Sequence, residues 1–130
     1  MKKIKKALIS VSDKQNLKYI LKNLSKYKIE LISSGGTYKE INKLKFKCIE
    51  ISKYTESPEI LGGRVKTLHP KIHAGILNKR SNKIHQKEIE QNNFENIDLV
   101  IVNFYPFEKI LEKTNNHNKI IENIDVGGPT

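Results

Sequence analysis

The chain has 130 residues, of which 37% are hydrophobic, as expected for one domain with its own core. Its 24 basic and 14 acidic residues give a net charge of +10. The lone Cys48 excludes an internal disulfide, and no apolar run is long enough for a membrane-spanning helix or a signal peptide, so we expect a cytoplasmic protein without a membrane partner. Because 22 of the 24 basic residues are lysines and no nucleic-acid-binding motif accompanies them, we interpret the surplus as a solvated surface and expect no nucleic acid partner.

In the first half of the chain, apolar runs of strand length alternate with helical patterns. Leu17, Ile20, Leu21 and Leu24 recur at helical spacing, after Ser12 or Asp13 as N-cap. The expected strands are 6–11, 29–32 and 46–51, and the expected helices are 17–24 and 37–43. Strands separated in this way need crossover connections, which favours an α/β fold with a parallel sheet.

The second half is less regular until its strongest strand. Residues 97–104 are nearly all apolar and β-branched, which is typical of a central parallel strand. The other expected elements are a helical turn at 57–61 with Pro58 at its first position, a long loop at 62–75, a polar helix at 81–92, short helices near 107–111 and 118–123, and a further strand ending at Val126.

Six of the seven glycines occur as pairs, namely Gly35-Gly36, Gly62-Gly63 and Gly127-Gly128. Paired glycines allow positive φ angles and close approach of the backbone to a ligand. Turn formation alone accounts for any one pair. Three pairs indicate a shared crevice at the carboxyl ends of the strands, where open α/β sheets bind ligands.

Two turns, SVSDK at 10–14 and SSGGT at 33–37, lie where a strand gives way to a helix. Backbone N–H groups, hydroxyls and a lysine at a helix N-terminus form an anion site suited to a phosphate. Simple helix capping by Ser12, Asp13 and Thr37 is the alternative. The turns match neither the P-loop pattern nor G-x-G-x-x-G, which weakens ATP and dinucleotide hypotheses.

The run from Arg64 to His73 gathers cations and histidines in one irregular segment. Arg64 offers a bidentate guanidinium, and Lys66 is suited to proton transfer or to stabilising negative charge. Zinc binding by His69 and His73 is disfavoured because Pro70 separates them and no further ligands lie nearby, so we expect no metal.

Three polar residues close the last strands. Asn103 and Tyr105 follow the strongest strand, and Asp125 precedes the last glycine pair. In a parallel sheet these positions meet the other turns at one edge. Tyr105 and Asp125 are therefore acid–base candidates beside Lys66, although Asp125 is equally suited to capping the turn that follows it.

Five segments occur in collinear order, namely LISVSDK, ELISSGGT, GGRVKTLHPKIHAGIL, DLVIVNFYPFE and ENIDVGGPT. Together they resemble the inosine monophosphate cyclohydrolase domains of bifunctional purine-biosynthesis enzymes. The resemblance implies a three-layer methylglyoxal-synthase-like fold, with a mostly parallel sheet and helices on both faces. It also implies closure of formyl-AICAR ribonucleotide to inosine monophosphate, a purine ribonucleotide monophosphate as ligand, no cofactor, and a homodimer.

The resemblance also implies roles for individual residues. Those at the phosphate end are Ser12, Lys14, Ser34, Gly35, Gly36 and Thr37. Those around the base are Arg64, Lys66, Thr67, Asn103, Asp125 and Gly127, and further substrate-binding residues are Asp13, Val65 and Val126. Lys66 would stabilise the oxygen that becomes negative, while Tyr105 and Asp125 would move protons.

The chain ends before a helical run in which such domains carry a further catalytic lysine, and it contains no formyltransferase domain. We therefore expect residues 1–130 to be an incomplete domain that binds nucleotide but catalyses weakly or not at all. A non-catalytic regulatory domain that binds a nucleotide or phosphate is the alternative, similar to the allosteric domain of carbamoyl phosphate synthetase. Methylglyoxal synthase is disfavoured, because Arg64 follows Gly62-Gly63 where that enzyme has an aspartate.

Overall fold

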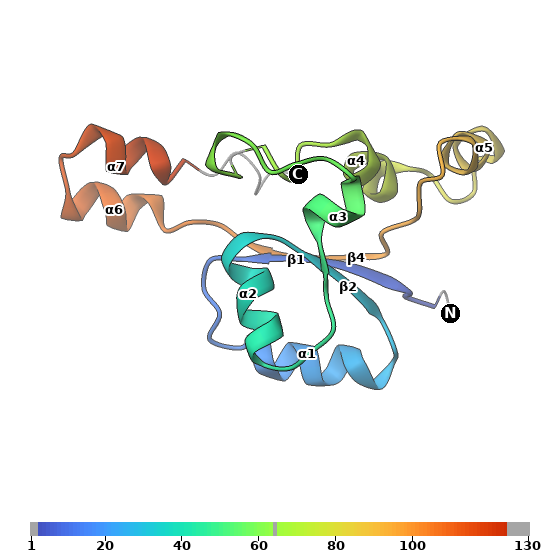
Figure 1. Cartoon of the computed structure of the whole chain (residues 1–130), viewed down its shortest axis with the longest axis horizontal. Coiled ribbons are helices and arrows are strands. Elements are labelled where there is room, and N and C mark those ends of the chain that lie inside the picture. The colour runs from blue at the N-terminus through green and yellow to red at the C-terminus, as the bar shows by residue number, and fades with distance from the viewer. Residues whose placement is uncertain (1–2, 64, 125–130) are drawn as a thin grey trace.

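The computed structural model describes residues 3–63 and 65–124, and within them one parallel sheet lies between two layers of helices (Figure 1). The strands are β1 (Lys6–Val11), β2 (Glu30–Ser33), β3 (Ile49–Glu50) and β4 (Leu99–Asn103), in the order β3-β2-β1-β4. Ile9 of β1 lies opposite Ser33 on one side and Ile101 on the other. The carboxyl ends of β1, β2 and β4 therefore meet at one edge of the sheet.

Different helices cover the two faces of the sheet. Helices α1 (Leu17–Lys26) and α2 (Gly35–Lys43) pack on one face, and α3 (Ile51–Thr55) and α4 (Pro70–Leu77) pack on the other (Figure 1). Because strand side chains alternate between faces, Ala7 and Ile9 join the first cluster, whereas Leu8 joins the second. This arrangement confirms the expected α/β fold with a parallel sheet and helices on both faces.

The remaining elements come before or after β4 in the sequence. They are the 3-10 turn η1 (Leu61–Gly63), α5 (Lys83–Gln91), α6 (Phe107–Lys113) and α7 (His117–Glu122). Strand β4 lies at the edge of the described sheet, where Val100 and Val102 are 40% and 39% exposed. The expectation of a central strand at 97–104 is therefore not met within these residues, and the further strand expected at Val126 lies outside them.

The structure corrects four local expectations. The strand expected at 46–51 is limited to Ile49–Glu50, because α3 begins at Ile51. The segment 62–75 is not one long loop, because α4 begins at Pro70, with His69 as its N-cap. Proline suits a first helical position, where no backbone N–H donor is needed. Residues 57–60 form no helical turn, since the helix lies earlier, in α3. The N-cap of α1 is Asn16, rather than Ser12 or Asp13.

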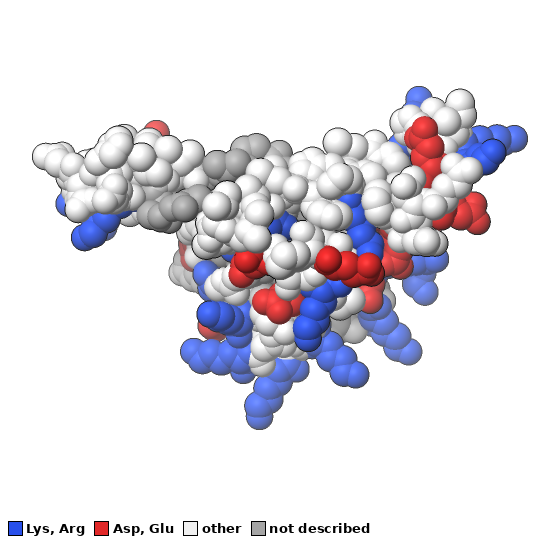
Figure 2. Space-filling model, turned by 45° about the horizontal axis from the view of Figure 1, so that its top comes forward, with Lys and Arg blue, Asp and Glu red and all other residues white. Residues whose placement is uncertain are grey.

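The lysine surplus faces solvent. Figure 2 shows Lys and Arg side chains gathered over the layer that α1 and α2 form. The exposed lysines of these two helices are Lys18, Lys22, Lys26, Lys39 and Lys43. This placement agrees with the interpretation as a solvated surface. No helix in the described ranges has the length and apolar character needed to cross a membrane.

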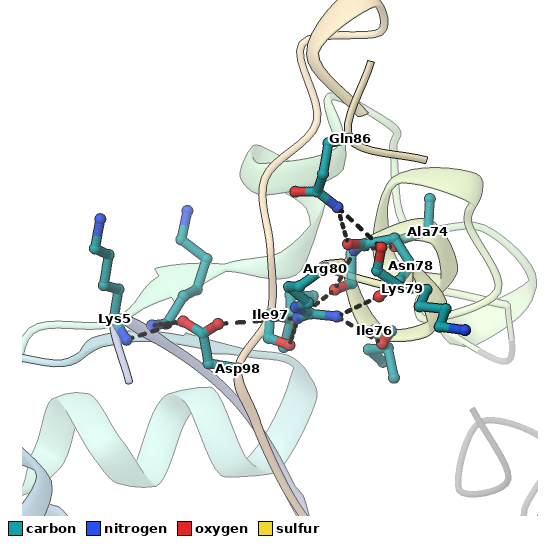
Figure 3. Close-up of polar contacts among 11 residues, drawn as sticks. Lys5, Ala74, Ile76, Asn78, Lys79, Arg80, Gln86, Ile97 and Asp98 are labelled. Carbon is teal, nitrogen blue, oxygen red and sulfur yellow. Dashed lines mark hydrogen bonds and ion pairs between the residues drawn. The ribbon is translucent and has the colours of Figure 1, made fainter. Parts of the chain in front are cut away.

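Arg80 joins the end of α4 to the segment that enters β4 (Figure 3). Its guanidinium donates hydrogen bonds of 2.7–3.2 Å to four backbone carbonyls, those of Gly75, Ile76, Asn78 and Ile97. The last carbonyls of a helix have no partner within the helix, so a side-chain donor there stabilises the helix end. Arg80 therefore holds α4 against the sheet.

Lys6 is buried at the amino end of β1, the opposite end from the edge where the strands finish. Its ammonium pairs with Glu30 at 2.7 Å and with Glu95, and lies 4.9 Å from the centroid of the Tyr54 ring. Burial alone would lower the pKa of Lys6, but the hydrogen bonds to the two carboxylates outweigh it and raise the pKa above 10.5. Lys6 therefore stays charged at neutral pH.

We expect this network to stabilise the fold fully below about pH 10.5 and to lose its effect as the pH rises through the folded-state pKa, because the unfolded chain releases the proton first. Unfolding should be measured in a Tyr54→Phe background, since burial raises the pKa of Tyr54 as well. In that background, Lys6→Met should flatten the fall in stability above about pH 10.5, and the exposed Lys5→Met should not. Equal slopes for both variants would contradict the expectation.

Candidate functional site

Asn103, the last residue of β4, binds the turn that follows β1. Its side-chain oxygen accepts hydrogen bonds from the backbone N–H groups of Ser12, at 2.6 Å, and Asp13, at 3.1 Å. Its side-chain nitrogen donates to the carbonyl of Asp13 at 3.0 Å. Asn103 therefore fixes the turn that carries Lys14, and it occupies two N–H groups that a phosphate would otherwise use.

The first turn of α2 faces the same edge. Ser34 is its N-cap and makes no side-chain capping bond, so the N–H groups of Gly35, Gly36 and Thr37 have no partner within the helix. The Thr37 hydroxyl is used structurally, because it donates to the carbonyl of Val11 at 2.9 Å and accepts from the N–H of Val11 at 3.1 Å. Anion binding here would therefore rely on main-chain N–H groups and on the positive end of the helix dipole.

Two lysines from distant segments lie beside consecutive glycines of this turn. A Cβ atom on Gly35 would lie 2.7 Å from Lys66 Nζ, and one on Gly36 would lie 3.8 Å from Lys14 Nζ. Gly35 also has a φ of +52°, a conformation that glycine adopts readily. The structure thus brings together Lys14, the glycine turn and Lys66 in one positive site.

The loop that carries Lys66 contributes a carboxylate. Glu59 Oε1 lies 3.4 Å from Lys66 Nζ. A Cβ on Gly63, whose φ is +84°, would lie 2.9 Å from this oxygen and 3.2 Å from the ammonium. In the same loop Val65 is half-buried and lines a cavity of about 160 Å³ with Lys66, whereas Thr67 is buried.

Sequence analysis missed Glu59, although it is the only acidic residue in the run 57–75. A lone carboxylate among cations is the signal that would have identified it, because ion pairing with one of those cations is then expected.

Among the remaining predicted residues, one lies just after β4 and the others lie outside the described ranges. Tyr105 follows β4 and is 45% exposed. Four predicted residues lie outside the described ranges, namely Arg64, Asp125, Val126 and Gly127.

Two histidines, His69 and His73, take part in hydrogen bonds at the start of α4. His69 Nδ1 accepts a hydrogen bond from the N–H of Lys71, and His73 Nδ1 lies 3.1 Å from the carbonyl of His69. Residues 3–63 and 65–124 contain no group of three His, Cys, Asp or Glu side chains that could hold a metal ion. Burial raises the pKa of the Cys48 thiol to about 12, so Cys48 is no nucleophile at neutral pH.

The site can therefore bind a phosphate at the glycine turn and a polar group near Lys66. It offers the Lys14 ammonium and helix N–H groups at Gly36, and the Lys66 ammonium, paired with the Glu59 carboxylate, beside Gly35. Such groups suit a reaction that depends on orientation and on stabilisation of developing negative charge.

Comparison with known proteins identifies one family and one group of relatives. A family model described as "MGS-like domain" matches residues 16–130. The bifunctional purine biosynthesis protein PurH of Prochlorococcus marinus (strain MIT 9301) is 52% identical over 125 residues, which cover 95% of this chain and 24% of that protein. PurH of Acetivibrio thermocellus is 50% identical over 128 residues, covering 98% of this chain and 25% of that protein. The chain thus spans about a quarter of the length of these curated relatives.

A solved structure, titled "Crystal structure of ForH", has a similar fold. It superposes with a TM-score of 0.80 and 29% sequence identity, over 97% of this chain and 64% of that one.

Proposed function

The chain belongs to the MGS-like domain family, and from this premise we propose that it is an inosine monophosphate cyclohydrolase domain of purine biosynthesis. Its reaction would close formyl-AICAR ribonucleotide to inosine monophosphate with loss of water. The names of the relatives that share about half of its residues support the pathway.

The observation that carries the proposal is the meeting of Lys14 and Lys66 at Gly36 and Gly35. Two ammonium groups from segments 52 positions apart in sequence converge on the N-terminus of α2, where a phosphate is favoured. A nucleoside monophosphate with its phosphate at Gly36 and Lys14 would extend its base past Gly35, toward Lys66 and its loop.

In the proposed reaction the carboxamide nitrogen of the substrate attacks the formyl carbon, forming the new C–N bond of the ring. The formyl oxygen then leaves as water, with one hydrogen from the carboxamide nitrogen and one from the formamido nitrogen. Lys66 would stabilise the negative charge that develops on this oxygen. Because both reacting groups belong to one molecule, orientation supplies much of the acceleration.

The remaining roles rest on the resemblance in sequence. Tyr105 and Asp125 would move protons, and Arg64, Thr67 and Asn103 would lie around the base. Val65, Val126 and Gly127 would contact it through the backbone. We also propose that the protein acts as a homodimer in the cytoplasm.

We expect the chain to bind inosine monophosphate and Lys14→Met to weaken binding about tenfold, because one charge-assisted contact to the phosphate is lost. Isothermal titration calorimetry at low and moderate salt measures this. Lys18→Met is the matched control, since it removes the same charge from an exposed position of α1. Failure of the folded chain to bind, or equal effects of both variants, would contradict the proposal.

Measuring whether the chain catalyses ring closure distinguishes this proposal from a regulatory role. Ring closure is followed by the absorbance change as formyl-AICAR ribonucleotide disappears. Binding without measurable ring closure would favour the non-catalytic nucleotide-binding domain, whose site would use the same phosphate turn.

A further inference from the structure

Glu59 gives the two lysines of the site different electrostatic surroundings. Lys66 Nζ lies 3.4 Å from the Glu59 carboxylate, so its charge is largely compensated. Lys14 Nζ instead donates to the carbonyl of Ser12 at 3.1 Å, and no described carboxylate pairs with it. Among the residues that the structure describes, the site therefore has an ammonium without a carboxylate partner at Lys14 and a paired ammonium at Lys66.

Both glycine turns hold the Glu59–Lys66 pair in place. The Lys66 ammonium lies beside Gly35 and Gly63, and the Glu59 carboxylate lies beside Gly63 on the same side, since one Cβ on Gly63 would be close to both groups. A side chain at either position would require the flexible ends of the pair to shift. The carboxylate thus stays beside the space that the far end of a ligand would enter from the phosphate turn.

We infer that Glu59 determines the ligand specificity of this site, admitting ligands with one anionic group and an uncharged polar far end and disfavouring ligands with a second anionic group. This inference rests on the proposed function, because it places the phosphate of the ligand at Gly36 and Lys14. A second anionic group near Lys66 meets the Glu59 carboxylate and is repelled, whereas a carbonyl or amide still accepts or donates a hydrogen bond there.

The size of the effect follows from exposure. The side chains of Lys66 and Glu59 are 27% and 42% exposed, so the pair contributes little to stability. Neutralising Glu59 should therefore leave the fold intact and change the binding of charged ligands. One unit charge acting over about 5 Å at a dielectric constant close to that of water, which suits a pair this open to solvent, corresponds to a change of about fivefold in affinity.

The test compares two probes that differ by one phosphate, ribose 5-phosphate and ribose 1,5-bisphosphate. Their dissociation constants are measured from the amide NMR shifts of Gly35 and Gly36 during titration. Glu59→Gln should raise the preference for the bisphosphate about fivefold over that of the unaltered chain. Glu59→Asp, which keeps the charge, should retain most of the original preference.

Glu56→Gln is the matched control. It removes the same charge from a glutamate three positions away, whose carboxylate pairs with Lys71 at 3.7 Å. The Lys71 ammonium lies over the Tyr54 ring at 5.1 Å from its centroid, and not beside the glycine turn. This variant should leave the preference unchanged.

Titration with inosine monophosphate separates the two ideas. If the unaltered chain binds this nucleotide and Glu59→Gln leaves the bisphosphate preference unchanged, the role of Glu59 is overturned and the proposed function stands. If the nucleotide fails to bind but the preference shifts, the role of Glu59 is supported and the proposed function fails. Absence of binding by all probes overturns both.

Discussion

We expect Arg80→Ala to lower the free energy of unfolding by about 2–4 kcal/mol. The substitution removes four hydrogen bonds from a charged donor and takes this donor from the carbonyls of Ile76, Asn78 and Ile97, whereas the Gly75 carbonyl still accepts from Ile97 N–H and Asn78 Nδ2. Each such bond is worth about 1.5–3 kcal/mol when lost singly, but bonds to one guanidinium are not additive, and water reaches part of the site.

Urea unfolding followed by circular dichroism measures this loss. Lys79→Ala is the control, since it removes the same charge from an exposed neighbouring side chain and should change the stability by less than about 0.5 kcal/mol. Arg80→Lys should recover only part of the loss, because an ammonium cannot reach carbonyls on both sides. If Arg80→Ala and Lys79→Ala had equal effects, water would be replacing the guanidinium without cost.

Arg80 also illustrates where sequence reasoning reached its limit. The chain has two arginines, and the sequence predicted a role for the guanidinium of Arg64 alone. Arg80 also needs its planar guanidinium, because it donates to four backbone carbonyls. Backbone acceptors leave no pattern in the sequence, so this role could not be predicted.

Periodicity predicted the regular part of the fold. Strand β1 has the bounds expected from its apolar run, Lys6–Val11, and α1 contains all four apolar residues that predicted it. Helix α4 was missed because its glycine and its cations obscure an apolar pattern, and its start depends on the cap that His69 forms. Its close contact with the sheet depends on Gly75, where a Cβ would lie 2.7 Å from the carbonyl oxygen of Glu95.

Topology explains how much of the candidate site was predictable. Parallel strands bring their carboxyl ends to one edge, so the turns at 10–14 and 33–37 were expected to meet, as was Asn103. The hydrogen bonds at that edge were not predictable, because they depend on the conformations of individual side chains. The Thr37 hydroxyl donates a hydrogen bond to the carbonyl of Val11, and the Asn103 side chain accepts one from the backbone N–H of Ser12. Both side chains are therefore held in place by the protein itself.

The strongest test of the site compares its two adjacent glycines. We expect Gly35→Ala to weaken the binding of inosine monophosphate about 30-fold, because its Cβ would lie 2.7 Å from Lys66 Nζ and displace the ammonium. Loss of one charge-assisted contact, at about 2 kcal/mol, accounts for this factor. The φ of +52° adds strain of about 1–2 kcal/mol to the folded state, which lowers stability without preventing folding.

Gly36→Ala is the matched control for that substitution. Gly36 lacks a positive φ, and its Cβ would lie 3.8 Å from Lys14 Nζ, an ordinary van der Waals distance. Calorimetric titration of both variants should therefore show a much smaller loss for Gly36→Ala, together with unchanged stability. Equal losses of affinity would mean that the glycine backbone itself contacts the ligand at both positions. In that case Gly35 would not be needed to place the Lys66 ammonium. Unequal losses in the expected order would locate the contribution of Gly35 in the space it leaves for the Lys66 ammonium.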